Sequence, residues 1–263
     1  MIIESVLLAS AMAAAAGLVG CFAVMRRMAL AGDALSHVAL PGIGVALALG
    51  IHPVLGAATM LFFGALLVWA LEDRARVATE TLIGVVFSTA LAAGSMITSG
   101  DELIDALLGR PGALSQTEIV LGLLAAALVI GFVLRSRDAL VVALVSPDIA
   151  RTAGVNVSRL NLIYLEMFAL TVALGLRYLG VLLMGSLLII PAATAKRVSG
   201  SLTQMLTVAA AAAVAATLAG SAAAAWLHRE SGPLIVTAAA AGFVLTLLRR
   251  GTDDPDHEMS RGV

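Results

Sequence analysis

Two side chains with metal-binding chemistry stand one helical turn apart in the stretch 29–44. Asp33 offers a carboxylate and His37 an imidazole, and in an α-helix their spacing puts both on one face. Pro41 follows four residues after His37 and has no N–H, so the His37 carbonyl loses its helical partner. A carboxylate together with a neutral imidazole suits zinc, manganese or ferrous iron. The spacing therefore indicates Asp33 and His37 as candidate metal ligands.

Two ligands are too few for a closed metal site. If two copies of the chain met on a twofold axis, two Asp33–His37 pairs would supply four ligands, enough for tetrahedral zinc. The alternative interpretation is a pair that satisfies itself and holds one helix in place. Pro41 and Gly42 also predict that the helix is broken near this point.

The composition indicates the class of protein that must position this pair. The 263 residues are 60% hydrophobic and 13% charged, with a mean hydropathy of +1.03. Soluble domains are about one-quarter charged, so a soluble chain of this size could not bury so much apolar surface. The apolar runs are long and continuous, which predicts an all-α fold, a polytopic transmembrane helical bundle.

Nine apolar segments approach the roughly 20 residues that a membrane helix needs, and eight full spans plus one broken helix is the alternative count. The segments cover residues 3–25, 28–50, 53–71, 80–99, 118–134, 160–176, 179–195, 202–227 and 234–248. With the N-terminus outside, only Arg110, Arg177 and Arg229 of the 16 basic residues fall outside, and the remaining 13 fall inside. The positive-inside rule therefore favours an outer N-terminus and a cytoplasmic C-terminus.

Two further features carry candidate functions. Glu166 lies in the segment 160–176, where a buried carboxylate is either a second carboxylate on a pore or a protonated side chain bonded to a neighbouring helix. On the cytoplasmic side, Pro147 and Asp148 predict a helix start and Gly154 predicts its end. This short helix, within about 146–159, is either a docking element for another protein or an ordinary connecting loop.

Three collinear motifs resemble one known family, the metal ABC-3 family of permease subunits from bacterial zinc, manganese and iron ABC importers. The motifs are Gly32-Asp-Ala-Leu-Ser-His-Val-Ala-Leu-Pro-Gly42, then Ser146-Pro-Asp148 with Ala150 and Gly154-Val155, and Gly185-Ser-Leu-Leu-Ile-Ile-Pro-Ala-Ala-Thr-Ala-Lys-Arg197. The likeness covers residues 1–250, as a single transmembrane permease domain. It places Asp33 and His37 at the family's metal-binding acid and histidine, and Asp148, Ala150 and Gly154 in its ATPase-coupling segment.

The resemblance implies a multi-pass protein of the inner membrane that forms a homodimer among membrane lipids. Two cytoplasmic ATPase subunits would dock on the coupling segments, and an extracytoplasmic metal-binding protein would deliver the ion. The chain itself has no G-x-x-x-x-G-K-[ST] motif, so we expect a transport subunit rather than an enzyme. We expect no permanently bound cofactor, only the transported ion, and no nucleic-acid partner.

Two other functions compete with metal import. A permease for an iron chelate or cobalamin would share the architecture but has a longer chain and no need of an Asp–His pair. An intramembrane metalloprotease would need a motif such as H-E-x-x-H, which is absent. The tail 251–263 is polar and acidic, and we expect it to be disordered on the cytoplasmic side.

Overall fold

The computed structural model describes residues 2–28, 31–75, 77–97, 115–178, 181–229 and 231–250, and these parts of the chain hold helices and turns but no strands. The expected tail, 251–263, lies outside the described residues. The described helices are α1 (Ile2–Met25), α2 (Ala31–Ala48), α3 (Pro53–Ala75), α4 (Thr79–Ile97), α6 (Gln116–Val145), α7 (Pro147–Thr152), α8 (Val157–Tyr178), α9 (Val181–Val198), α10 (Leu202–Leu227) and α11 (Ser231–Arg250). The all-helical fold class is thus confirmed.

Each of the nine expected apolar segments contains a helix, but the count of nine crossings remains a prediction. Within the described residues, six helices are long and apolar enough to span a bilayer, namely α1, α3, α6, α8, α10 and α11. The apolar parts of α2 and α4 are shorter, covering His37–Ala48 and Thr79–Gly94. Length and composition therefore support a multi-pass membrane protein.

The fifth segment is longer than the hydropathy predicts. We expected it to end at residue 134, before the basic residues Arg135 and Arg137, but α6 continues to Val145. It begins with a capping box, in which the Glu118 N–H donates to the Ser115 hydroxyl and the Ser115 N–H donates to the Glu118 carboxylate. Beyond residue 134 no proline or glycine interrupts the backbone hydrogen bonds, so the helix extends past its apolar part.

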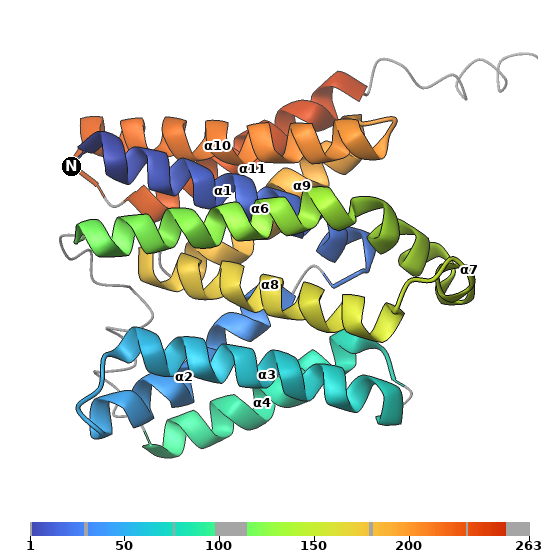
Figure 1. Ribbon diagram of the computed structural model, residues 1–263. Coiled ribbons are helices and arrows are strands. Elements are labelled where there is room, and N and C mark those ends of the chain that lie inside the picture. Colours follow the sequence, from blue (N-terminus) through green and yellow to red (C-terminus); the bar gives the residue numbers. More distant parts are fainter. Residues whose placement is uncertain are drawn as a thin grey trace, which may run out of the picture.

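Helix α1 lies at the centre of the larger group of helices and packs on α6, α8, α9 and α10 (Figure 1). Its small residues permit this close approach. A Cβ on Gly17 would lie 2.8 Å from the Ala209 carbonyl oxygen of α10, and one on Gly20 would meet the Leu188 backbone of α9. Membrane helices associate through such close van der Waals contacts, because lipid offers no hydrophobic driving force between them.

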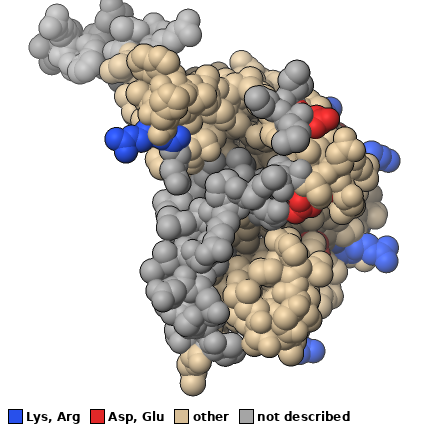
Figure 2. All heavy atoms as spheres, turned by 90° about the vertical axis from the view of Figure 1, so that its left-hand side faces the viewer, with Lys and Arg blue, Asp and Glu red and all other residues tan. Residues whose placement is uncertain are grey.

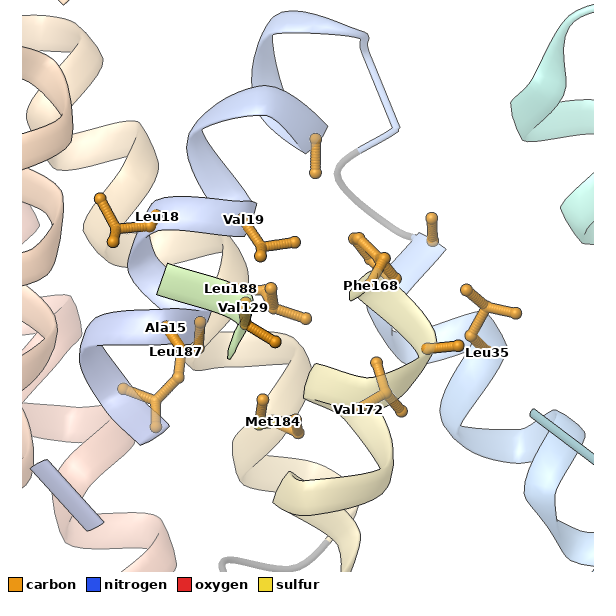
Figure 3. Packing of buried hydrophobic residues seen from close by; sticks show 14 of the residues in the cluster. Ala15, Leu18, Val19, Leu35, Val129, Phe168, Val172, Met184, Leu187 and Leu188 are labelled. Atoms are coloured by element: carbon orange, nitrogen blue, oxygen red, sulfur yellow. The ribbon is translucent and has the colours of Figure 1, made fainter. Parts of the chain in front are cut away.

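The core joins this larger group to α2. Figure 3 shows side chains of α1, α2, α6, α8 and α9 converging on one apolar cluster. Leu35 of α2 and Phe168 of α8 meet there, and both are nearly fully buried. Helices α2, α3 and α4 form a second group, in which α2 packs on both of the other two helices, and α3 joins this group to α8 (Figure 1).

The helices run so that positive charge collects at one end of the bundle. Figure 1 shows α1 and α6 running toward the end that carries α7, and α8 running back from it. Arg26 and Arg27 follow α1, and α9 carries Lys196 and Arg197 in its last turn. The opposite end, which faces the viewer in Figure 2, shows mainly uncharged side chains among the described residues, with a few acidic ones and with basic ones toward the edges of the view.

Candidate metal site and coupling helix

Asp33 and His37 both lie in α2, on the same face, as the spacing predicts. The expected break at Pro41 and Gly42 is not found, because α2 continues through Pro41 as one helix to Ala48. Pro41 and Gly42 are both buried, and each lies in close contact with a neighbouring helix, Pro41 with Gly94 of α4 and Gly42 with Gly56 of α3. Pro41 still leaves the His37 carbonyl without the N–H donor that an ordinary residue would supply.

The imidazole of His37 is half-buried and lies against the ring of Phe87 in α4. The two ring centroids are 5.5 Å apart, with the planes tilted by 52°. The side chain of Asp33 lies outside the described residues. Among the described residues, no group of three or more His, Cys, Asp and Glu side chains lies close enough together to hold a metal ion. His37 therefore does not belong to a complete ligand set formed by the described side chains of one chain.

Glycines bring α2 and α3 into backbone contact one turn beyond His37. A Cβ on Gly42 would lie 2.8 Å from the carbonyl carbon of Gly56, and one on Gly56 would lie 2.8 Å from the carbonyl carbon of Gly42. A Cβ on Gly94 of α4 would lie 3.2 Å from Cδ and Cγ of Pro41. The helix that carries the candidate ligands is thus held on two sides at the level of Pro41.

Glu166 is half-buried in α8, and its Oε2 atom is buried without a hydrogen-bond partner. Neighbouring positions of the helix, Leu165 and Phe168, are almost fully buried. An unpaired carboxylate is costly in an apolar setting. Glu166 does not join His37 in any group of three described ligands.

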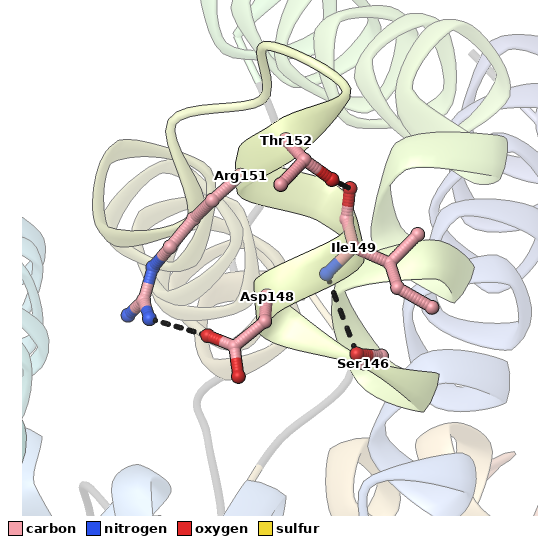
Figure 4. Close-up of polar contacts among 5 residues, drawn as sticks. All are labelled: Ser146, Asp148, Ile149, Arg151 and Thr152. Carbon is pink, nitrogen blue, oxygen red and sulfur yellow. Dashed lines mark hydrogen bonds and ion pairs between the residues drawn. The ribbon is translucent and has the colours of Figure 1, made fainter.

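The short helix predicted within 146–159 is present as α7 and projects from the end of α6 (Figure 1). Ser146 is its N-cap and accepts from the Ile149 N–H at 3.4 Å, while Pro147 occupies the first turn (Figure 4). Asp148 pairs with Arg151 at 3.0 Å on the exposed side. Gly154 ends the turn with a φ of 82°, the left-handed conformation that favours glycine.

One face of α7 is anchored and the other is free. Ala150 is fully buried and packs with Ala143 and Val157 of the flanking helices. Ile149 is 61% exposed and Val145, just before the helix, is 78% exposed. Two exposed apolar side chains, one at the end of α6 and one on the capped helix α7, are typical of a surface that binds another protein. The sequence motif contains Asp148, Ala150 and Gly154 and gives no sign of Ile149 as a contact residue. Ile149 is exposed because α7 packs through Ala150, on another side of the helix.

The first two turns of α8, which follow α7, contact α1 and α3, the helices that precede and follow α2 in the sequence. Arg26, at the end of α1, donates from Nη2 to Oδ1 of Asn161 at 2.9 Å and lies 4.5 Å from the ring centroid of Tyr164. The indole N–H of Trp69, near the end of α3, donates to the Ser158 carbonyl at 2.9 Å. Sequence reasoning missed these contacts, because each joins residues far apart in the chain and none forms a motif.

The amino-acid sequence and the fold of this chain are similar to those of known proteins. Residues 1–250 match the ABC 3 transport family. The high-affinity zinc uptake system membrane protein ZnuB of Haemophilus influenzae is 30% identical over 238 residues, which is 88% of this chain and 90% of that protein. The manganese transport system membrane protein MntC of Listeria monocytogenes is 28% identical over 236 residues, covering 88% and 84%.

A further relative and a solved structure are similar to this chain over most of its length. The chelated iron transport system membrane protein YfeD of Yersinia pestis is 32% identical over 235 residues, covering 88% of this chain and 79% of that protein. Among solved structures, a chain of PsaBC from Streptococcus pneumoniae in complex with Fab superposes with a TM-score of 0.77 at 25% identity, covering 92% of this chain and 89% of that chain. The likeness therefore extends over nearly the whole helical bundle.

Proposed function

Because the chain belongs to the ABC 3 transport family, we propose that it is the membrane-spanning permease subunit of an ATP-driven importer of divalent transition metal ions. The relatives named for zinc and manganese transport support this substrate class. The chain is a multi-pass membrane protein and a transport subunit rather than an enzyme, and ATP is hydrolysed on a separate ATPase subunit. A permease for cobalamin or an iron chelate is not favoured, although YfeD is named for chelated iron.

Asp33 and His37 are the proposed ligands that the ion meets on its path. The observation that carries this proposal is the half-buried imidazole of His37 on α2, in a helix where Asp33 shares its face. Since one chain offers no complete set among the described residues, a homodimer that juxtaposes two α2 helices would complete it. Imidazole and carboxylate accept zinc, manganese and ferrous iron alike, so the pair defines a class of ion rather than one ion.

We propose that the ATPase subunits dock on α7 from the cytoplasm, with Asp148, Ala150 and Gly154 shaping the helix and Ile149 making contact. The basic residues that follow α1 and end α9 support a cytoplasmic position for this end of the bundle. An extracytoplasmic metal-binding protein would then deliver the ion at the opposite end (Figure 2). This orientation puts the N-terminus outside and the C-terminus inside.

Glu166 is proposed as a secondary carboxylate of the same pathway in the dimer. Its buried and unpartnered Oε2 supports a role beyond packing within one chain. In the transport cycle, closure of the ATPases would move α7, and the contacts of α8 with α1 and α3 would pass that movement to the helices around α2. The ion would pause at Asp33 and His37 before it is released inward.

The test is metal uptake by vesicles that contain the purified permease with its ATPase. Asp33→Ala and His37→Ala should abolish uptake of zinc, manganese and iron while the dimer still assembles, because each removes a ligand side chain and keeps the helical backbone of α2. Matched controls are Asp138→Ala, whose carboxylate is 81% exposed, and His228→Asn at the left-handed C-cap of α10. Normal uptake by His37→Ala would refute the assignment of the site.

A further inference from the structure

We propose that Phe87 of α4 is a positioning residue for metal transfer, which holds the imidazole of His37 in the orientation that a passing ion requires. The inference rests on the proposed function, in which His37 is a metal ligand. It concerns a side chain on a different helix, outside the three motifs that identify the family. Phe87 itself has no ligand atom and so acts only through His37.

The observation is the contact between the two rings. Their centroids lie 5.5 Å apart and their planes are tilted by 52°, within the range of favourable aromatic geometry. Both side chains are half-buried. Because Phe87 presents only carbon and hydrogen, it covers part of the imidazole without competing for the ring nitrogens.

A second contact keeps α4 in register with α2. A Cβ on Gly94 would lie 3.2 Å from the ring carbons of Pro41 and 3.3 Å from its nitrogen, so the two helices approach closely at this point. Proline has no N–H, and the apolar face of its ring can therefore be covered without losing a donor. Helix α4 packs chiefly on α2, and thus meets α2 at His37 and again one turn further on, at Pro41.

The chemical consequence follows from the way imidazole binds a metal. The lone pair that coordinates the ion lies in the ring plane, so the plane must be aimed at the ion before binding is strong. Metal-binding histidines are generally oriented by a neighbour that restricts the ring. In this chain no hydrogen-bond partner of the His37 ring occurs among the described contacts, and the aromatic contact of Phe87 takes that role. Without this contact, part of the binding free energy of each ion would be lost to ordering the His37 ring.

The experiment compares Phe87→Leu, which keeps most of the apolar volume, with Phe87→Tyr, which keeps the ring. Zinc and manganese uptake are measured with the assembled permease–ATPase complex in vesicles over a range of free metal. Phe87→Leu should raise KM roughly three- to tenfold at an unchanged Vmax per assembled complex, the fold-change expected when one more side chain must be ordered on binding. Phe87→Tyr should keep the KM of the parent protein.

The matched control is Phe63→Leu, because that phenylalanine is 56% exposed on α3 and the ring contact described for His37 is with Phe87. If Phe87 serves only packing, Phe87→Leu will lower thermal stability and leave KM unchanged, which would overturn the inference. The variant His37→Ala distinguishes failure of the proposed metal site from failure of the proposed role of Phe87. Normal uptake by His37→Ala would refute the proposed metal site itself, whereas abolished uptake together with a parental KM in Phe87→Leu would refute only the role of Phe87.

Discussion

The contact between Gly56 of α3 and Gly42 of α2 allows a quantitative test of how the candidate site is held. In Gly56→Ala, the added Cβ would lie 2.6 Å from the Cβ of Ala46 and 2.8 Å from the carbonyl carbon of Gly42, whereas ordinary contacts are 3.4–4 Å. Relief of the clash requires the two helices to separate by about 1 Å, since a backbone carbonyl cannot rotate away. A gap of about 1 Å forfeits up to half of the dispersion energy of the atoms concerned.

Overpacking of this kind costs about 1–3 kcal/mol. With a Tm change of about 2–4 °C per kcal/mol for a chain of this size, Gly56→Ala should lower the Tm by about 2–12 °C. The assay is thermal unfolding of the purified permease in detergent. Because α2 carries His37, we also expect metal uptake to fall by more than the loss of folded protein explains.

Two variants make the argument refutable. Gly84→Ala, in α4, adds a Cβ that meets nothing within 4 Å, so its better helix propensity should keep or raise the Tm. Adding Ala46→Gly to Gly56→Ala removes the 2.6 Å clash but leaves the one with the Gly42 backbone, so the rescue should be partial. A Tm of Gly56→Ala equal to that of Gly84→Ala would show that the two helices are not in backbone contact.

Two further predictions concern the other end of the bundle. Ile149→Asp should abolish co-purification of the ATPase, because it places a charge at the exposed apolar residue of α7. The control Asn156→Asp keeps the cap on the Arg159 N–H and should leave co-purification unchanged. Retained binding by Ile149→Asp would exclude that residue from the contact. Arg26→Leu should cost about 1.5–3 kcal/mol of stability, since it removes a charged hydrogen bond to Asn161 and the contact with Tyr164. The exposed Arg74→Leu serves as its control in the same unfolding measurement, and equal Tm values would contradict the reasoning.

Much of the architecture was predictable because it depends on local chemistry. Continuous apolar runs require helices in a bilayer, so every expected segment contains a helix. The start and end of α7 were also predictable, since Pro147 and Gly154 act through their own backbone conformations. The extension of α6 to Val145 was not, because hydropathy reports where the lipid ends rather than where the helix ends.

The candidate site also has features that were predictable from the sequence and features that were not. Residue types and a helical period were enough to pair Asp33 with His37 and to name the ions that suit them. The local rule that proline breaks a helix was wrong at Pro41, because α2 continues through this residue, in close contact with Gly94 of α4.

By itself, therefore, the sequence determined the helical class, the membrane setting, the motif pair and the capped short helix α7, all of which depend on neighbours within a few residues. Only the tertiary structure decided that Phe87 lies on His37, that α2 meets α3 through glycines, and that Arg26 joins α1 to α8. Those contacts depend on how whole helices are placed beside one another. In a membrane that placement is decided by close packing, which no periodic pattern along a single helix records.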